Sequence, residues 1–369
     1  MPQPWSSPEA LKTDCRWFRG DIPCRPHKQE GVHCVDGQGR PCPHYEAAGR
    51  NLLIIKLGAI GDVIRTTPLL TRFRSTMPDA RIWWLTLTPE VVPRSVDVVL
   101  PFTPQSLATL SAVRFDTIVN LDKDREACAL TARLESGVKK GFTLRNGTPA
   151  PIAADAVHKF MTGVFDDLNR ANTKSYVEEI FEVCGMRFAG ERYILDPFTD
   201  RGYRWKLPAK KRIIGLNTGC GGRWTSRLWA EKNWVALARR LRRAGHVPLL
   251  LGGEQEHAKN TRIARASGAR YPGHFPLPQF INLVHQCDLV VTAVTMAMHI
   301  TIGLNRKIVL FNNIFNRHEF ELYGLGEILE PDFDCPCFFT PVCPNDCMQY
   351  ITVDRVFEAC TRVLDGKGA

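Results

Sequence analysis

Runs of six or seven largely apolar residues alternate with longer segments of helical period along two stretches of the chain. The first stretch predicts strands at residues 52–57, 81–87, 97–102, 116–121 and 139–144. The second predicts strands at residues 212–217, 247–253, 288–293 and 307–313. Apolar strands that alternate with helices are typical of parallel sheets covered by helices on both faces. The pattern therefore predicts an α/β protein with two doubly wound, Rossmann-like domains that face each other across a cleft.

Helices are predicted between and after these strands. They are expected at residues 63–77, 125–137, 173–185, 230–244, 256–268 and 353–365. Pro68 falls early in the first of them and predicts a kink, because a proline inside a helix removes a backbone hydrogen bond. The predicted division is an irregular segment at 1–50, a first domain at 51–205 and a second domain at 206–369. The closing helix could also pack back on the first domain.

Composition narrows the class of protein. The chain has 369 residues, of which 44% are hydrophobic and 23% charged, as in a globular protein of more than one domain. It has no apolar run long enough for a membrane-spanning helix and no secretory signal pattern, so we expect a cytoplasmic protein. The net charge of +10 predicts an anionic partner: nucleic acid, a phosphorylated metabolite or an acidic membrane surface. Peripheral contact with the inner face of the membrane is therefore open.

Cysteine is unusually frequent, with 13 residues, and eight of them lie in two short clusters. The two clusters are Cys15, Cys24, Cys34 and Cys42 near the amino end, and Cys335, Cys337, Cys343 and Cys347 near the carboxyl end. In a reducing compartment four thiolates are typical of a tetrahedral zinc or iron site rather than of disulfides. His27 or His33 could replace one thiolate in the first cluster. Such a metal would have a structural role, and free thiols are the alternative.

A carboxylate stands where the first predicted strand gives way to a helix, in the sequence GAIGDV. Gly58 and Gly61 permit a tight turn and a close approach of a ligand to the backbone. The spacing differs from GxGxxG, and no acidic residue ends the second strand, which disfavours a nicotinamide-dependent oxidoreductase. Asp62 lies at the edge of the sheet where ligands of such folds bind. It could cap the helix or act as a general base.

The stretch LIIKLGAIGDVIRTTPLL resembles the amino-terminal signature of glycosyltransferase family 9, the ADP-heptose:lipopolysaccharide heptosyltransferases. The resemblance covers about residues 51–365 and does not extend to residues 1–50. It implies a GT-B fold, transfer of heptose from ADP-heptose to an acceptor hydroxyl with inversion, and Asp62 as the catalytic base. The acceptor would enter the first domain near Asp62, and the nucleotide-sugar would bind the second.

The donor site is expected in the second half of the chain. The sequence GLNTGCGGRWTSRLW reads as a strand, a glycine-rich loop and a helix, whose amides would bind an anion. We expect the loop glycines to approach the diphosphate together with two arginines; these residues are Gly219, Gly221, Gly222, Arg223 and Arg227. The family usually has Lys-x-Trp-Pro where this chain has Arg227-Leu228-Trp229-Ala230. A glycine turn with surface arginines is the alternative.

Two further stretches contribute to the predicted donor site. The family's Asp-Thr/Ser-Gly-x-x-His corresponds here to residues 294–299, where Thr295 and His299 match but the acid and the glycine do not. The resemblance places this turn, with Gly61 of the first loop, against the donor. Asn312 and Asn313 follow the next strand in a polar loop that suits sugar or base recognition. A core histidine and an asparagine-rich turn are the alternatives.

These features, taken with the resemblance, predict a glycosyltransferase, and the resemblance implies that it inverts the anomeric centre. Arg223, Arg227 and the loop amides would stabilise the leaving diphosphate, so no catalytic metal is expected. The acceptor would be a glycan, lipopolysaccharide or a protein. A metal-containing nucleic-acid-binding protein is one rival, but aromatic residues are not interleaved with the basic runs, so no nucleic acid is expected. A relative that binds nucleotide-sugar without catalysis is the other.

Overall fold

A computed structural model describes residues 7–198, 205–208, 210–333 and 335–366. The first six residues of the predicted 1–50 segment and residues 199–204 of the predicted first domain lie outside this part. Contacts group the chain into two compact units. The first runs up to Leu57 and continues over Leu69–Ala153, and the second contains Gly58–Pro68 and the chain from Ala154 onwards. The turn that carries Asp62 thus belongs to the second unit.

The first unit contains a mixed sheet. Among the described residues it has six strands in the order β3-β2-β1-β4-β5-β6, parallel except for β6, which runs antiparallel to β5. Their bounds are β1 (Arg50–Ile55), β2 (Ala80–Thr86), β3 (Val98–Pro101), β4 (Phe115–Asn120), β5 (Ser136–Arg145) and β6 (Thr148–Pro151). Leu53 of β1 is fully buried between its partners Trp83 and Ile118. The first five correspond to predicted strands, whereas β6 is short, rich in proline and was not predicted.

The prediction of one kinked helix at residues 63–77 is wrong. The structure has α2 (Ile60–Ile64) and then α3 (Pro68–Thr76), with Pro68 at the first position of the second helix. Proline is favoured there because its missing N–H has no partner in the first turn and its φ angle already suits a helix. The first unit also contains α4 (Pro104–Ser111) and α5 (Arg125–Arg133), which bury Leu110 and Ala127 against one face of the sheet.

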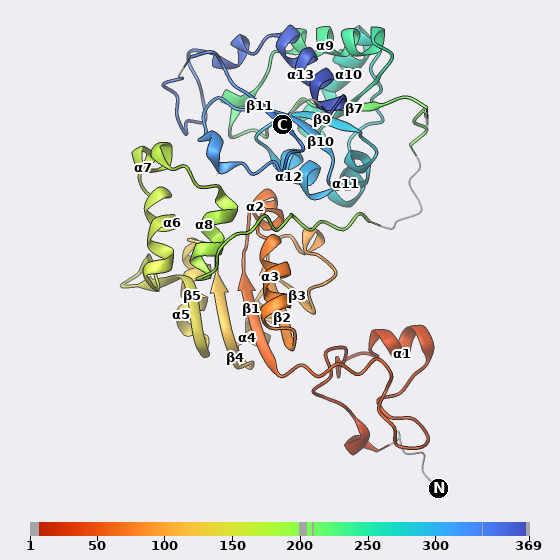
Figure 1. Cartoon of the computed structure of the whole chain (residues 1–369), viewed down its shortest axis with the longest axis vertical. Helices are drawn as coiled ribbons and strands as arrows, with labels where there is room; N and C mark the ends of the chain where they lie inside the picture. The colour runs from red at the N-terminus through yellow and green to blue at the C-terminus, as the bar shows by residue number, and fades with distance from the viewer. Residues whose placement is uncertain (1–6, 199–204, 209, 334, 367–369) are drawn as a thin grey trace. The chain divides into compact units, whose positions relative to one another are not determined.

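The amino-terminal segment has little regular structure (Figure 1). Within residues 7–49 the described elements are a 3-10 turn (Pro8–Ala10), α1 (Arg25–Glu30) and the isolated bridges Cys15↔Ala47 and Val35↔Pro41. Only three of these residues are buried: Cys15, Pro26 and Val35. So few buried side chains cannot supply an ordinary hydrophobic core.

The second unit contains an all-parallel sheet. Among the described residues it has five strands in the order β11-β10-β9-β7-β8. Their bounds are β7 (Ile213–Asn217), β8 (Val247–Leu251), β9 (Leu289–Ala293), β10 (Lys307–Phe311) and β11 (Gly326–Leu329). Every residue of β7, β8 and β9 is buried, as expected for strands covered on both faces. The strand order reverses between β7 and β9, which is where ligands of such sheets bind.

Helices cover both faces of the second sheet (Figure 1). The helices of this unit after α2 are α6 (Val157–Thr162), α7 (Asp166–Ala171), α8 (Tyr176–Val183), α9 (Glu231–Arg243), α10 (His257–Ser267), α11 (Leu277–His285), α12 (Met296–Gly303) and α13 (Val353–Leu364). α9, α10 and α13 bury Leu237, Ile263 and Val356 in one core with the strands. The closing helix α13 thus buries apolar side chains in the core of the second unit. Among the described residues the helices are too short or too polar to span a bilayer.

Candidate functional site

A pocket of about 850 Å³ lies within the second unit. Its wall contains the loops that follow β7, β8, β9 and β10, together with the turn before α2. The structure brings seven of the predicted residues into this wall: Gly61, Asp62, Gly219, Gly221, Arg227, Thr295 and His299. The loops meet because the carboxyl ends of parallel strands share one edge of a sheet.

Asp62 is the third residue of the short helix α2. One carboxylate oxygen accepts a hydrogen bond from the backbone N–H of Ala59 at 3.2 Å, and the other lies 2.9 Å from the guanidinium of Arg65. The carboxylate therefore caps the helix from inside its first turn. About a third of the side chain is exposed, 32%, so the capping contact leaves it open to the pocket. This geometry is compatible with Asp62 as a helix cap and with Asp62 as a general base.

Arg65 was not identified from the sequence. Its guanidinium lies between the carboxylates of Asp62 and Glu319, at 2.9 and 2.7 Å, and 3.4 Å from the ring centre of Tyr176. Burial alone would lower the pKa of Arg65, but the two carboxylates outweigh it and raise the pKa above its usual value. The arginine is thus a fixed cation that orients Asp62. An i,i+3 spacing on a helix is the only signal that could have suggested the pair.

His299 of α12 packs directly on the Asp62 turn. A Cβ atom on Gly61 would lie 2.3 Å from Cδ2 of this ring. Tyr193 stacks on the imidazole at a centroid distance of 6.1 Å. Burial first, and the charge of Arg65 second, lower the pKa of His299 to about 3, so the ring is neutral. Its Nδ1 atom is buried without a hydrogen-bond partner among the described residues.

Arg227 joins two loops at the pocket. It donates hydrogen bonds to the backbone carbonyls of Val294 and, at 3.0 Å, of Cys220. Among the described residues no carboxylate forms an ion pair with it. Burial lowers the pKa of the guanidinium, as expected for a cation that has left water without a counter-charge. A partly buried, uncompensated arginine in a pocket is an arrangement that favours a bound anion.

The amino terminus of α12 also opens into the pocket. Thr295, Met296 and Ala297 line the wall at the start of the helix. The hydroxyl of Thr295 is held by the amide of Asn217 at 3.3 Å and by the hydroxyl of Thr292 at 3.1 Å. The first backbone N–H groups of a helix have no partner within it and carry a partial positive charge. They add to the anion-binding character of Arg227.

The glycine loop after β7 is packed tightly against the loop after β8. A Cβ atom on Gly219 would come within 2.3 Å of the carboxyl group of Glu256. Gly221 has a φ angle of +74°, which glycine adopts without the penalty of a side chain. Lys259 donates to the Thr218 carbonyl at 2.7 Å, and burial lowers the pKa of this ammonium. Glu256 lines the pocket and was missed from the sequence.

Four predicted donor residues do not line the pocket. Gly222 and Arg223 are exposed beyond the loop, and Arg223 instead lies over the ring of Trp224. Asn312 is buried and its amide bonds to the Phe315 carbonyl at 2.8 Å. The amide of Asn313 donates to the Ser226 carbonyl, also at 2.8 Å. The two asparagines thus shape the loops around the pocket.

An aromatic group in the wall was also missed. Phe339 lies edge-on to Trp224 and to Phe315, with centroid distances of 5.4 Å in both cases. These three side chains come from three separate loops, and all line the pocket. No spacing in the sequence links them, so only tertiary structure reveals the group.

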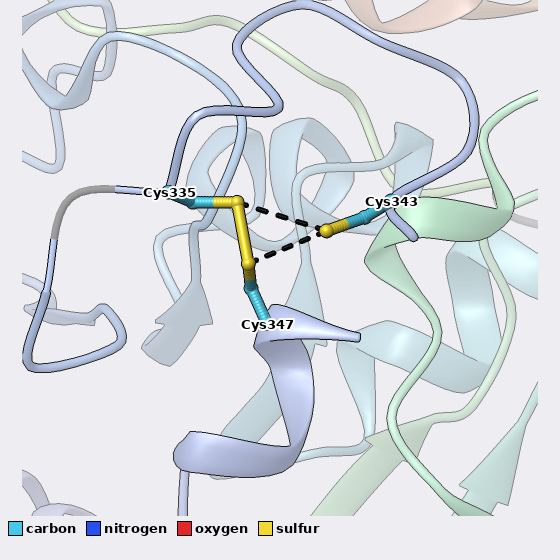
Figure 2. A group of neighbouring side chains, drawn as sticks. All are labelled: Cys335, Cys343 and Cys347. Carbon is cyan, nitrogen blue, oxygen red and sulfur yellow. Dashed lines mark hydrogen bonds between the residues drawn. A yellow bond between two sulfur atoms is a disulfide. The ribbon is translucent and has the colours of Figure 1, made fainter. Parts of the chain in front are cut away.

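Three of the four carboxyl-terminal cysteines lie together, as Figure 2 shows: Cys335, Cys343 and Cys347. The sulfur of Cys343 is 3.7 Å from that of Cys335 and 3.3 Å from that of Cys347, and the last two form a disulfide. Hydrogen bonding to Cys343 raises the pKa of the fourth thiol, Cys337. Ligand atoms of Cys335, Cys343 and Cys347 lie within 4.8 Å of one another, as in a thiolate metal site.

The amino-terminal cysteines surround one small cavity in the first unit. Its volume is about 20 Å³, and its wall includes Cys15, Cys24, Cys34 and Cys42 together with His33 and His44. The chain folds back between two of the cysteines, where the backbone N–H of Cys42 donates to the Cys34 carbonyl at 3.0 Å. Among the described residues, however, no three ligand atoms of this quartet lie within 4.8 Å of one another. Three sulfur atoms of the carboxyl-terminal quartet therefore lie closer together than any three of the amino-terminal quartet.

The sequence profile of glycosyltransferase family 9 (heptosyltransferase) matches residues 107–314, more than half of the chain. The chain belongs to this family. It is therefore a glycosyltransferase, and the predicted family is confirmed over residues 107–314, a range that begins after the stretch LIIKLGAIGDVIRTTPLL. None of the curated proteins matches the sequence.

Solved structures agree on the fold of this family 9 transferase. A glycosyl transferase family 9 protein from Veillonella parvula is 14% identical, with a TM-score of 0.65, covering 86% of this chain and 97% of its own. E. coli heptosyltransferase WaaC with ADP is 15% identical, with a TM-score of 0.55 and coverage of 86% and 99%. The iron-containing dodecameric glycosyltransferase TibC from enterotoxigenic E. coli is 13% identical, with a TM-score of 0.51 and coverage of 85% and 76%. The predicted GT-B class is confirmed.

Proposed function

We propose that this transferase moves a sugar, expected to be heptose from ADP-heptose, to an acceptor hydroxyl in the pocket of the second unit. One observation carries the proposal. The carboxylate of Asp62 and the uncompensated guanidinium of Arg227 line the same pocket. Glycosyl transfer from a nucleoside diphosphate needs both charges, one to accept a proton and one to bind the leaving diphosphate. The ADP and heptosyltransferase relatives support this choice of donor.

Asp62 would act as the general base. The acceptor oxygen attacks the anomeric carbon while the bond from that carbon to the diphosphate breaks. The proton of the acceptor hydroxyl passes to the carboxylate of Asp62. Arg65 orients the carboxylate, while Glu319 and Tyr176 hold Arg65 in place. Attack from the face opposite the diphosphate inverts the anomeric centre, which is the outcome expected for the family.

The diphosphate would bind at Arg227, the glycine loop and the amino terminus of α12. These groups are positioned before the reaction, so they stabilise the developing negative charge without reorganisation. Gly221 has a φ angle of +74° and open space where a side chain would lie, so a phosphate oxygen can approach its backbone closely. Because these groups can neutralise the leaving group, we expect no catalytic metal.

A structural metal would be bound by the carboxyl-terminal quartet. The sulfur separations of 3.3 and 3.7 Å are close to the edge of a tetrahedral tetrathiolate site, roughly 3.8 Å for zinc–sulfur bonds of about 2.3 Å. Zinc and iron both suit such ligands, and the TibC relative contains iron. Binding requires the reduced form, because the disulfide removes two of the four ligands. Metal binding by Cys15, Cys24, Cys34 and Cys42 stays a prediction.

The acceptor and the cellular location also stay predictions. A glycan, lipopolysaccharide or protein hydroxyl could each serve, and peripheral binding to an anionic membrane is open. The net charge of +10 supports any anionic partner equally.

The variant Asp62→Asn tests the base. It keeps the size of the side chain and the contact to the Ala59 amide through its carbonyl oxygen, but it cannot take a proton. Turnover of ADP-heptose should fall about 10²- to 10⁴-fold, the usual contribution of a general base. The affinity for ADP, measured by calorimetry, should stay nearly constant. The exposed Asp166 provides a matched Asp→Asn control. Normal turnover in Asp62→Asn would show that Asp62 is not the base.

A further inference from the structure

The loop that carries the carboxyl-terminal cysteines, residues 335–347, is hydrogen-bonded to the donor loop. The backbone N–H of Ser226 donates to the Pro341 carbonyl at 3.0 Å, and its hydroxyl donates to the Thr340 carbonyl at 2.9 Å. Ser226 directly precedes Arg227, whose side chain lines the pocket. The position of the cysteine loop thus fixes the backbone from which this guanidinium projects.

The same loop supplies part of the pocket wall. Phe339 packs on Trp224 and Phe315, and its backbone N–H donates to the Ile314 carbonyl at 2.8 Å. Its φ angle of +51° is unfavourable for a residue with a side chain, so the surrounding loop must hold it. Phe339 lies two residues after Cys337, and the Cys337 carbonyl accepts the Thr340 hydroxyl at 2.9 Å.

Apolar burial contributes little to the rigidity of this loop. No helix or strand is formed over the described residues 335–346. Phe339 and Val342 remain 44% and 63% exposed, and the buried side chains are those of Cys337 and Cys347. A segment with so few buried contacts is expected to open locally unless another interaction closes it. The neighbouring sulfur atoms of Cys335, Cys343 and Cys347 are the groups placed to do so.

We propose that metal binding at Cys335, Cys337, Cys343 and Cys347 is thermodynamically coupled to nucleoside diphosphate binding in the pocket. The proposal rests on the proposed function in one respect, that the pocket binds the donor nucleotide. Thiolates bound to zinc or iron fix the loop, which places Phe339 in the wall and Ser226 beside Arg227. Without the metal, the loop is not ordered before the nucleoside diphosphate binds, so the affinity for the nucleotide falls. Coupling is reciprocal, so the nucleotide must also strengthen metal binding.

Binding of ADP, rather than activity, tests the coupling. The full chain is prepared with thiol reductant, and its zinc and iron are quantified. Calorimetry then compares the metal-loaded protein with the chelator-treated protein and with Cys343→Ser. We expect the Kd for ADP to rise about 5- to 100-fold on loss of metal, within the usual range of coupling between sites. In the reciprocal measurement, saturating ADP should slow transfer of the metal to a chromogenic chelator.

Two variants separate coupling from general damage. Phe339→Ala and Ser226→Ala should retain the metal, bind ADP more weakly and lose most of the dependence of ADP affinity on metal. Phe333→Ala is the matched control, because this aromatic side chain lies near the loop, contacts Tyr350 and does not line the pocket. Cys34→Ser controls for the amino-terminal quartet and should leave ADP binding unchanged.

The possible failures are distinguishable. Equal ADP affinity with and without metal, together with an unchanged rate of metal transfer, overturns the coupling and leaves the proposed function intact. A reduced protein that binds no metal at this quartet also overturns it. Loss of ADP binding in every state, metal-loaded included, would overturn the donor site itself.

Discussion

The imidazole ring of His299 lies where a side chain on Gly61 would begin. The distance from a Cβ atom at residue 61 to Cδ2 of the ring would be 2.3 Å, far below any ordinary contact. Gly61 immediately precedes Asp62, and His299 belongs to helix α12 of the second unit. This helix therefore sets the position of the turn that carries the carboxylate. The absence of a side chain at one residue thus determines where the predicted base lies.

Gly61→Ala should displace the Asp62 turn. A shift of about 1 Å at a reacting group can lower turnover on the order of 10²-fold, so steady-state kinetics should show a loss of this size. The double variant with His299→Ala removes the clash and should recover part of the activity. Gly222→Ala is the matched control, because the nearest atom to its added Cβ would be 3.8 Å away. Equal activity of Gly61→Ala and the wild type would contradict the packing argument.

Arg65→Lys should impair turnover without weakening donor binding. Lysine cannot bridge two carboxylates in the way that a planar guanidinium does, and it cannot stack in the same way on the ring of Tyr176. We expect kcat to fall about 10-fold, because Asp62 is no longer held in one orientation. The Kd for ADP should change little. If kcat is retained and ADP affinity falls instead, Arg65 binds the nucleotide and does not position the base.

Arg227→Gln should weaken the diphosphate site. A hydrogen bond to a charged group contributes about 1.5–3 kcal/mol, so the Kd for ADP should rise roughly 10- to 100-fold. The salt dependence of binding should also decrease, since one cation is lost. Arg223→Gln provides the control on an exposed arginine four residues away in sequence. A similar loss in both variants would point to the general charge of the loop rather than to Arg227.

The neutral His299 should make the protein less stable in acid. Its pKa is about 3 in the folded state, against an ordinary value near 6.5, so the unfolded chain binds the extra proton between these two values. Stability is therefore complete above about pH 6.5 and falls as the pH decreases towards 3. Between pH 7 and pH 5 the loss should be about 2 kcal/mol for a fully buried ring. Urea unfolding at the two pH values measures it.

His299→Gln should remove this part of the pH dependence, because an amide does not titrate. The variant and the wild type should then differ in the slope of stability against pH, whatever their difference at pH 7. His318 is exposed and offers a His→Gln control for the substitution itself. Parallel slopes for His299→Gln and the wild type would show that this histidine is not held neutral.

Many of the strands and helices can be predicted from the local pattern of apolar and polar residues. Strands such as β7 and β9 are apolar throughout and end at polar turns, so their extent is determined by burial on both faces and can be recognised in the sequence. Helix starts were harder, since Pro68 fits both a kink and a first position. Short edge strands such as β6 and β11 lack a distinctive pattern, and their formation depends on a neighbouring strand.

The candidate site was only partly accessible from sequence. Asp62, Gly219 and Arg227 stand in recognisable turns after strands, and the topology brings those turns to one edge. Arg65 and Glu319 are 254 residues apart in the chain, and nothing in either neighbourhood indicates an ion pair. The aromatic group around Phe339 is equally remote in sequence. Contacts of this kind exist only once the chain has folded.

The sequence by itself determined the order of strands and helices, the residues able to carry charge at the strand ends and the eight clustered thiols. Burial period and turn chemistry are local properties, so each can be deduced from a few neighbouring residues. Tertiary structure decided which charges are compensated: it gave Arg65 two carboxylates and Arg227 none among the described residues. It also gathered the sulfur atoms of Cys335, Cys343 and Cys347 more closely than those of the amino-terminal quartet. Charge compensation and ligand geometry depend on distances between remote segments, which a local pattern does not contain.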